Sequence, residues 1–387
     1  MMAPSPEGSQ KKGLLLMHAA ALLWGLQFAF LGPALAVYLT SAFGATAAQV
    51  GLVLALYNAS GFIASLVVPM IADRRREYLG VMVACGVFAI ILATALALAP
   101  TLPVAAGALI VLGGPAGAGG SLLFAHVNAS GYSRSVVMGV RAMSSIAWVA
   151  GPPLAMLLAG FAGIRSVLIA MAVVAVTAVA LVAVMKRQHG RIDTPAKTTK
   201  DSSTALPLAR TAIVMLAFVA LHATNATMTS MMTLFASTNL GLDLAWGGVA
   251  LAVAALLEVP GLFLLGKLSG RYGPVPLMAV GIISGILFFL SMTVVDGVAG
   301  LLAAQVLNAW FVATISGVGL TWFMEIIPRP GLASGLFMNT YRVGAISAGA
   351  LVAISGTSSG FPGMFMACAG LATLALVVIL VLGRRSR

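Results

Sequence analysis

The chain has 387 residues, of which 61% are hydrophobic and 8% are charged, and its formal net charge is +12. A soluble surface needs far more charge, so the composition excludes a soluble globular protein. Long apolar segments from Gly13 onward predict a polytopic membrane protein. In such a protein an excess of positive charge is typical of cytoplasmic loops, so we expect no nucleic-acid partner.

Twelve apolar runs of roughly 20 residues are long enough to cross a bilayer as helices. The first begins right after Lys11 and Lys12 and continues without a persuasive cleavage site, so we interpret it as a helix rather than a signal peptide. The predicted helices cover residues 13–39, 49–71, 78–99, 103–126, 135–159, 165–185, 210–236, 245–267, 275–295, 299–323, 332–354 and 361–382.

The charges of the loops predict how these helices are oriented. With the N-terminus inside, 18 of the 21 lysines and arginines fall in cytoplasmic segments, and only Arg165 falls in an outer loop. The other two, Arg141 and Arg342, lie within predicted spans. Basic loops stay on the cytoplasmic side of a membrane. We therefore expect a multi-pass protein of the bacterial inner membrane with both termini in the cytoplasm.

The longest polar segment divides the chain in two. Residues 186–209 carry charges, Pro, Ser and Thr and have almost no apolar content, which is typical of a flexible linker. We expect this linker to join an N-terminal six-helix bundle over 13–185 to a C-terminal six-helix bundle over 210–383. Short cytoplasmic ends over 1–12 and 384–387 complete the predicted organisation.

The two halves show a weak internal repeat. A shift of 197 positions places Gly44 over Gly241, and it places Gly61 over Glu258. Near the end of each half, a shift of 201 places Arg141 over Arg342. Two related halves of six helices are typical of transporters whose substrate site lies near the bilayer midplane. The fold class that we predict is all-α, with twelve transmembrane helices in two pseudo-symmetric bundles.

Three motifs resemble those of the major facilitator superfamily. "PMIADRRRE" (69–77) resembles the signature after helix 2 through Asp73 and Arg74, and "LGKLSGRYG" (265–273) resembles its second-half copy through Arg271. "WVAGPPLAMLLAG" (148–160) is similar to the helix-5 motif associated with antiporters, through Gly151 and Pro152. The resemblance implies the major facilitator fold, and we expect a monomer.

A narrower resemblance points to one family within that superfamily. Three stretches are similar to those of the bacterial sugar efflux transporters: "RSVVMGVRAMSSIAWVAGPPLA", "LLEVPGLFLLGKLSGRYG" and "QVLNAWFVATISGVGLTWFMEIIPRPGLASGLFMNTYRVGAISAG". They cover most of the predicted helices 5, 8, 10 and 11. The resemblance implies proton-coupled export of sugars such as lactose, glucose and thiogalactoside analogues.

Ionisable side chains within membrane spans are functional candidates because inserting each one costs about 2.5–3.5 kcal/mol on insertion scales. Glu258, Arg141 and Arg342 are such residues, and we interpret them as the proton-coupling group. A desolvated carboxylate favours the protonated form, whereas a neighbouring arginine favours the ionised form, and proton exchange needs both tendencies. The alternative is a static ion pair that holds the helices together.

Sugars need amides for their hydroxyl groups and aromatic rings for their C–H faces. Trp24 and Gln27 are three residues apart and share one helix face, as do Gln305 and Asn308. The alternative for each is a hydrogen bond between helices. The predicted substrate-binding residues are Trp24, Gln27, Asn58, Asn225, Gln305, Asn308 and Asn339.

A further set of residues is assigned to gating by the superfamily resemblance. We expect Glu325, near the end of helix 10, to pair with Arg271 or Arg329 at the cytoplasmic side. The predicted gate and motif residues are Asp73, Arg74, Gly151, Pro152, Arg271 and Glu325. The sequence contains no nucleotide-binding motif and no cluster of metal ligands, so we expect neither a cofactor nor a bound metal.

The sequence thus predicts a secondary transporter that exports sugars, or small molecules like them, by proton antiport with alternating access. The nearest alternative is a proton-coupled multidrug efflux antiporter, because the 20 methionines could line an apolar drug site. An enzyme is not expected, since no His-Glu-x-x-His motif is present and every Asp lies in or near a predicted loop.

Overall fold

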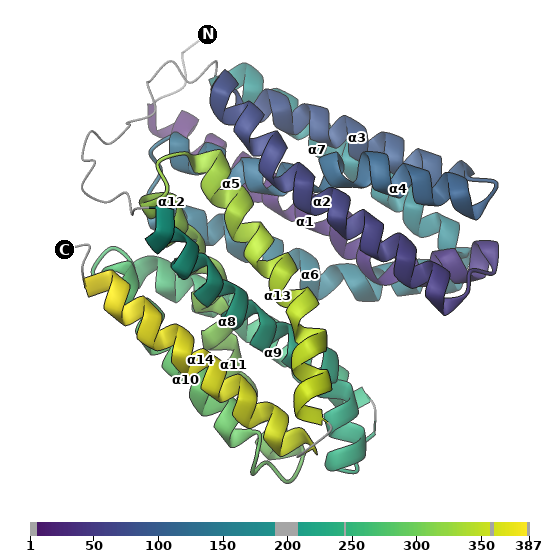
Figure 1. Cartoon of the computed structure of the whole chain (residues 1–387). Helices are drawn as coiled ribbons and strands as arrows, with labels where there is room; N and C mark the ends of the chain where they lie inside the picture. Colours follow the sequence, from purple (N-terminus) through teal and green to yellow (C-terminus); the bar gives the residue numbers. More distant parts are fainter. Residues whose placement is uncertain (1–5, 190–207, 244, 357–359, 385–387) are drawn as a thin grey trace. The chain divides into compact units, whose positions relative to one another are not determined.

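The structure is a computed structural model that describes residues 6–189, 208–243, 245–356 and 360–384. It is all-helical in these ranges, and it divides into two compact units (Figure 1). The first unit comprises the described residues of 1–136, 143–199 and 329–335, and the second those of 137–142, 200–328 and 336–387. Most of the predicted linker lies outside the described residues.

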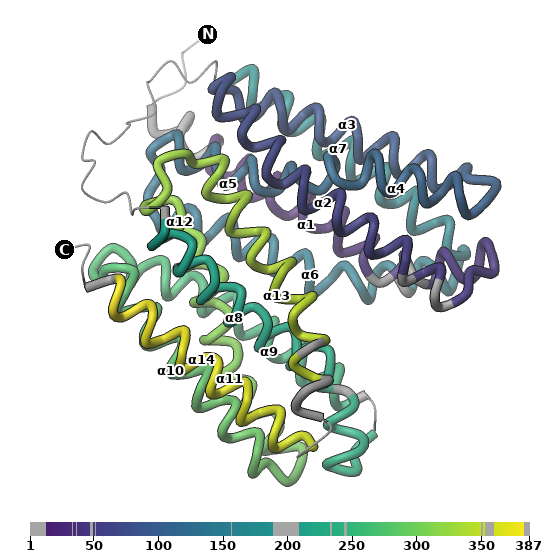
Figure 2. Tube along the Cα trace, in the orientation of Figure 1, coloured from purple at the N-terminus to yellow at the C-terminus, as the bar shows by residue number. Residues whose placement is uncertain are grey.

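The first unit contains seven helices along the chain, which Figure 2 traces by colour from purple to blue. Residues 137–142 of α6 belong to the second unit, and the start of α13 belongs to the first. The helices are α1 (Pro6–Phe43), α2 (Ala47–Arg75), α3 (Tyr78–Leu98), α4 (Leu102–Gly117), α5 (Gly119–Ala129), α6 (Arg134–Ala162) and α7 (Ile164–His189).

The second unit is built from the remaining elements, two of which are single turns of π-helix. In this unit α10 packs against both α11 and α14, and α9 packs against α11. The elements are α8 (Leu208–Leu234), η1 (Phe235–Asn239), α9 (Ala245–Leu268), α10 (Pro274–Ser291), α11 (Val298–Ala313), η2 (Thr314–Val318), α12 (Gly319–Ile326), α13 (Pro330–Gly356) and α14 (Gly360–Arg384).

The predicted membrane spans are confirmed closely. Within the described ranges, eleven helices are long and apolar enough to cross a bilayer. The remaining predicted span corresponds to α13, which carries the polar stretch "NTYR" (339–342) in its middle. Large apolar side chains such as Phe161, Leu98 and Ile346 are more than 70% exposed, as expected for surfaces that face lipid. The chain is a multi-pass membrane protein.

Local chemistry explains where several helices begin and end. Thr46 and Gln49 form a capping box at the start of α2, in which each side chain accepts a hydrogen bond from the other residue's backbone N–H. Gly44, in the turn before α2, has a φ of +63°, and Gly241, before α9, has the same value. A positive φ favours glycine, so the internal repeat preserves this turn in both halves.

Two predicted helices are interrupted, which the sequence did not indicate. The predicted span 103–126 is divided into α4 and α5 at Ala118, three residues after Pro115, which lacks a backbone N–H and so weakens the local helical hydrogen bonding. The predicted span 299–323 contains η2, where Thr314 packs against Gly281 so closely that a Cβ on Gly281 would lie 2.3 Å from it. Turns of π-helix are frequent at functional sites.

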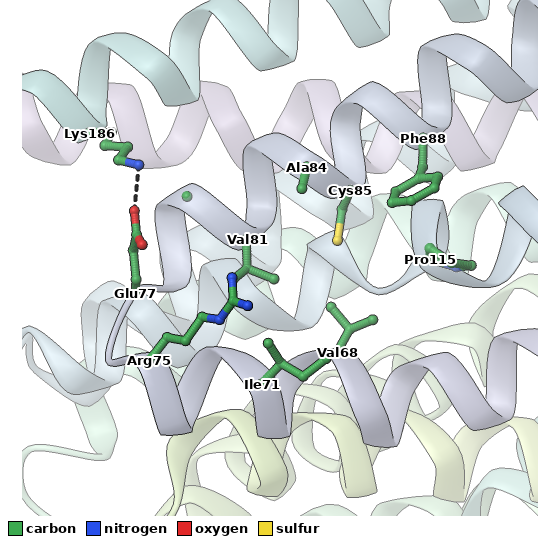
Figure 3. A pocket seen from close by; sticks show the side chains of 11 residues that line it. Val68, Ile71, Arg75, Glu77, Val81, Ala84, Cys85, Phe88, Pro115 and Lys186 are labelled. Carbon is green, nitrogen blue, oxygen red and sulfur yellow. Dashed lines mark ion pairs between the residues drawn. The ribbon is translucent and has the colours of Figure 1, made fainter.

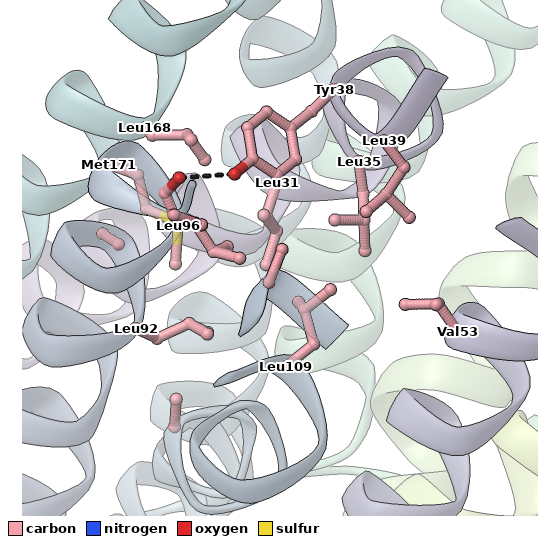
Figure 4. Close-up of a cluster of buried hydrophobic side chains, with 14 of the residues drawn as sticks. Leu31, Leu35, Tyr38, Leu39, Val53, Leu92, Leu96, Leu109, Leu168 and Met171 are labelled. Carbon is pink, nitrogen blue, oxygen red and sulfur yellow. Dashed lines mark hydrogen bonds between the residues drawn. The ribbon is translucent and has the colours of Figure 1, made fainter. Parts of the chain in front are cut away.

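The core of the first unit is a cluster of buried aliphatic side chains around Tyr38 (Figure 4). The Tyr38 hydroxyl donates a hydrogen bond to the Leu96 carbonyl oxygen, so its polar atom is satisfied inside the cluster. Lipid tails are as apolar as leucine, so helices in a bilayer associate by close packing and hydrogen bonds rather than by leaving water. Small residues at helix contacts therefore determine how closely the helices can pack.

Glycines allow α1 to pack closely on its neighbours. A Cβ on Gly151 of α6 would lie 2.3 Å from the Cβ of Ala29, and one on Gly119 of α5 would lie 1.9 Å from the Trp24 ring. Real Cβ atoms do not come this close, so neither position tolerates a side chain without movement. The predicted motif residue Gly151 thus has a packing role at the contact between α1 and α6.

We predict that Gly151→Val lowers the thermal stability of the protein, because the backbone of Ala29, 3.2 Å from the added Cβ, cannot move aside. Overpacking of this kind costs about 1–3 kcal/mol. The matched control is Gly160→Val on the same helix, where no atom lies within 4 Å of the added Cβ. Thermal unfolding in detergent measures both variants, and equal melting temperatures would contradict this account of the α1–α6 contact.

Candidate functional site

Glu258 is a buried carboxylate in the middle of α9. Its exposed fraction is 8%, and two polar groups of the second unit approach its Oε1 atom. The Ser316 hydroxyl donates a hydrogen bond over 3.2 Å, and the Arg141 guanidinium lies 3.9 Å away. Glu258 therefore lies close to an arginine, and this arginine is Arg141.

The geometry of this group is that of a loose ion pair. A distance of 3.9 Å is longer than the 2.7–2.9 Å typical of charge-assisted hydrogen bonds. The side chain of Arg141 is 26% exposed, whereas that of Glu258 is 11% exposed. The carboxylate is thus largely removed from solvent, and one guanidinium lies near it without a close hydrogen bond.

Ser316 is the member of this group that the sequence did not single out. It lies in η2, and the wider π-helical turn replaces regular α-helix over residues 314–318. A serine in an apolar helix is common, and only the fold brings this one to Glu258 from 58 residues away. The third predicted coupling residue, Arg342, lies half-buried on α13.

Two polar side chains of α1 are buried and have no hydrogen-bond partner in the part of the chain that the structure describes. Among the described residues, neither amide atom of Gln27, which is 0% exposed, has a hydrogen-bond partner, and the Nε1 atom of Trp24, which is 3% exposed, has none either. Buried polar groups are satisfied in the great majority of cases, and leaving one unsatisfied costs about 1–3 kcal/mol. The two predicted substrate residues therefore retain hydrogen-bonding capacity inside the first unit.

The other predicted amides fall into two groups. Gln305 donates to the Leu301 carbonyl and accepts from Asn308, so both side-chain amides are hydrogen-bonded along α11. Asn58 is exposed on α2 and donates to the Leu54 carbonyl. Asn339 is buried on α13, and Asn225 is half-buried on α8. On α8 the buried Thr227 hydroxyl, which no sequence pattern singled out, has no hydrogen-bond partner among the described residues.

Asp73 forms a hydrogen-bonded cap at the start of α13, within the first unit. Its Oδ1 atom accepts from the Gly331 N–H at 2.9 Å and from the Tyr78 hydroxyl at 2.7 Å, and its Oδ2 atom accepts from the Leu332 N–H at 2.9 Å. A helix N-terminus carries unsatisfied N–H groups and partial positive charge, so it binds a carboxylate well.

The contact between Asp73 and α13 also needs small residues. A Cβ on Gly331 would lie 2.7 Å from Oδ1 of Asp73 and 2.7 Å from the carbonyl oxygen of Pro69. Gly331 and Leu332 were not predicted as partners, because nothing in a local sequence pattern connects residues 258 positions apart. Of the other predicted gate residues, Arg74 and Arg271 are exposed, and Glu325 is half-buried at the end of α12.

Comparison with known families agrees with this architecture. The model of the Major Facilitator Superfamily matches residues 17–300. The chain belongs to the major facilitator superfamily. It is therefore a transporter rather than an enzyme, as predicted.

Relatives within the superfamily are named as sugar efflux transporters. Sugar efflux transporter A of Escherichia coli (strain K12) is 29% identical over 248 residues, which cover 63% of each chain. This chain thus spans less than two thirds of that relative's length. Sugar efflux transporter C of the same organism is 27% identical over 372 residues, or 93% of each chain. The resemblance seen in the sequence is confirmed.

Solved structures share the fold. The fucose:proton symporter of Escherichia coli superposes with a TM-score of 0.73 at 14% identity, covering 97% of this chain and 98% of that chain. At this identity the likeness shows the fold alone. The Asp73 motif, which resembles the superfamily signature, thus stands in a chain with the superfamily's architecture.

We predict that Asp73→Asn deprotects the first turn of α13. An amide keeps one acceptor oxygen but turns an N–H donor towards a backbone N–H, so it cannot accept from both Gly331 and Leu332. Hydrogen–deuterium exchange of the peptide that contains residues 330–335 should rise in this variant. Tyr78→Phe, which removes only the third hydrogen bond, is the control and should change exchange less. Unchanged exchange in Asp73→Asn would contradict the cap.

Proposed function

We propose that this transporter exports sugars, or small molecules that resemble them, across a bacterial inner membrane in exchange for protons, by alternating access. The relatives that are named sugar efflux transporters support the substrate class. The observation that supports proton coupling is the buried Glu258 carboxylate, held between Ser316 and a loosely paired Arg141. Both termini are proposed to lie in the cytoplasm, as the distribution of basic residues indicates.

Glu258 is proposed to be the site at which the proton is taken up and released. When Glu258 is protonated, its attraction to Arg141 falls, and the arginine becomes available to other acceptors. When the proton leaves, the carboxylate regains Arg141 and the Ser316 hydroxyl. Arg342, which the repeat aligns with Arg141, is proposed as a second basic member of the same coupling group.

Gln27 and Trp24 are proposed to bind the sugar. Their unsatisfied amide and indole groups offer three N–H donors and one acceptor oxygen in a buried setting, and sugar hydroxyls can satisfy both kinds. Asn225 and Asn339 are the further amides proposed to take part. The amides of Asn58, Gln305 and Asn308 are already engaged in the protein, so their proposed role is to maintain local structure.

A panel of ligands tests the proposed substrate class. We expect lactose, glucose or a thiogalactoside to raise the melting temperature of the purified protein, and lipophilic cations to leave it unchanged. Stabilisation by lipophilic cations without stabilisation by sugars would instead favour a multidrug antiporter.

The Gln27→Leu variant makes this test residue-specific. Replacing an unsatisfied buried amide by an apolar side chain of similar size should stabilise the free protein, by about 1–3 kcal/mol, and should remove the shift caused by sugar. Asn58→Leu, at an exposed position, should keep that shift. A Gln27→Leu variant that loses stability and keeps the sugar-induced shift would show that Gln27 is structural.

Glu258→Gln is expected to separate sugar movement from proton coupling. The amide resembles the protonated carboxyl in shape but cannot release or take up a proton, so sugar exchange across proteoliposomes should continue while uphill efflux driven by a pH gradient is lost. Glu258→Asp keeps a carboxylate and should retain part of the uphill activity. Uphill efflux by Glu258→Gln at the wild-type rate would overturn the coupling role.

A further inference from the structure

A groove of about 390 Å³ opens on the first unit, and Figure 3 shows the side chains that line it. The lining comes from α2, α3, α4 and the end of α7, and it contains none of the residues proposed above for coupling or sugar binding. One wall is apolar along most of its length. Its principal apolar residues are Val68 and Ile71 of α2 and Val81, Ala84 and Phe88 of α3.

The apolar wall continues into surface of the kind that faces lipid. Ile71 and Phe88 are 39% and 38% exposed, and the neighbouring Val67, Val87 and Ile91 are exposed to a similar extent. In a multi-pass membrane protein such side chains face the hydrocarbon tails. An acyl chain can therefore lie along the wall of the groove without crossing a polar barrier.

The other end of the groove is charged. Glu77 and Lys186 form an ion pair there, and Figure 3 shows it beside Arg75. Gly80 makes room for the pair, since a Cβ on Gly80 would lie 2.2 Å from Oε1 of Glu77 and 2.9 Å from Nζ of Lys186. The negative charge of Glu77 is thus offset by Lys186 within the protein.

Arg75 is left with an uncompensated positive charge. Among the residues that the structure describes, its guanidinium has no hydrogen-bond or ion-pair partner, although it lines the groove. The adjacent Arg74 and Arg76 are exposed and add to the positive potential. A guanidinium presents several N–H donors in a planar fork that matches a phosphate group.

The order of these features along the helices matches the layers of a membrane. Arg75 ends α2, Glu77 precedes α3, and Lys186 lies in the last turn of α7, so all three are at helix ends. The basic residues there belong to segments that the charge distribution places in the cytoplasm. The charged end therefore lies at the headgroup level, and the apolar wall extends into the hydrocarbon layer.

We propose that this groove binds one anionic phospholipid, with its phosphate at Arg75 and one acyl chain along Val68, Ala84 and Phe88. A phosphate next to a guanidinium satisfies the charge that the protein leaves open, and the apolar wall holds the chain. Basic pockets between helices on the cytoplasmic side are known to suit anionic headgroups. The site is independent of the proposed transport function.

Native mass spectrometry of the purified full-length protein tests the site, with phosphatidylglycerol, phosphatidylethanolamine and phosphatidylcholine of the same acyl composition as probes. The expected result is selective retention of one phosphatidylglycerol. Arg75→Gln should weaken that retention about fivefold, the factor that one basic residue contributes at an anionic membrane surface. Equal retention of the three lipids by the wild-type protein would overturn the proposal.

Two matched controls distinguish a built site from diffuse attraction. Arg187→Gln removes the same charge from an exposed residue next to Lys186 that does not line the groove, and it should keep retention near the wild-type level. Ala84→Trp should fill the groove and abolish retention with all charges in place, whereas Ala180→Trp, at an exposed position on α7, should not. Equal effects of Arg75→Gln and Arg187→Gln, or no effect of Ala84→Trp, would contradict the proposal.

Discussion

The absence of water from the bilayer interior is the constraint on which the rest of this structure depends. Every polar group inside must find its partner in the protein or in a ligand. Glu258 meets this condition within the protein, through the Ser316 hydroxyl and the nearby Arg141 guanidinium. Gln27 and Trp24 do not meet it within the described part of the chain. The carboxylate of Glu258 therefore has polar partners within the protein, whereas Gln27 and Trp24 keep hydrogen-bonding groups that a ligand can use.

The same constraint governs packing. Because helices gain little by leaving lipid for each other, their contacts depend on how closely the backbones approach. Gly151 against Ala29 and Gly119 against Trp24 are such contacts in the first unit. The second of them also places the Trp24 indole, since any side chain at residue 119 would occupy its position. A residue proposed for sugar binding is thus positioned by a glycine on a neighbouring helix.

The internal repeat preserves the scaffold but not the chemistry. Gly44 and Gly241 occupy equivalent turns with the same backbone conformation. The carboxylates differ: Glu258 aligns with Gly61, and Asp73 aligns with Gly270, so each acid is present in one half only. Asp73 satisfies backbone N–H groups at the start of α13, whereas Glu258 meets an arginine and a hydroxyl. One scaffold therefore carries two acids with different partners.

The sequence by itself determined the membrane class, the spans to within a few residues and the residues worth examining. These properties are local, because the length of an apolar run and the charges at its ends depend only on neighbouring residues. Tertiary structure decided which of these residues contact one another. It selected Arg141 beside Glu258, supplied Ser316 through the π-helical turn, and brought Asp73 to the amides of Gly331 and Leu332. It also showed that Asn308 donates a hydrogen bond to Gln305, while Gln27 has no partner among the described residues. The partners of Glu258 and Asp73 are far from them in the chain, and only packing brings these residues together.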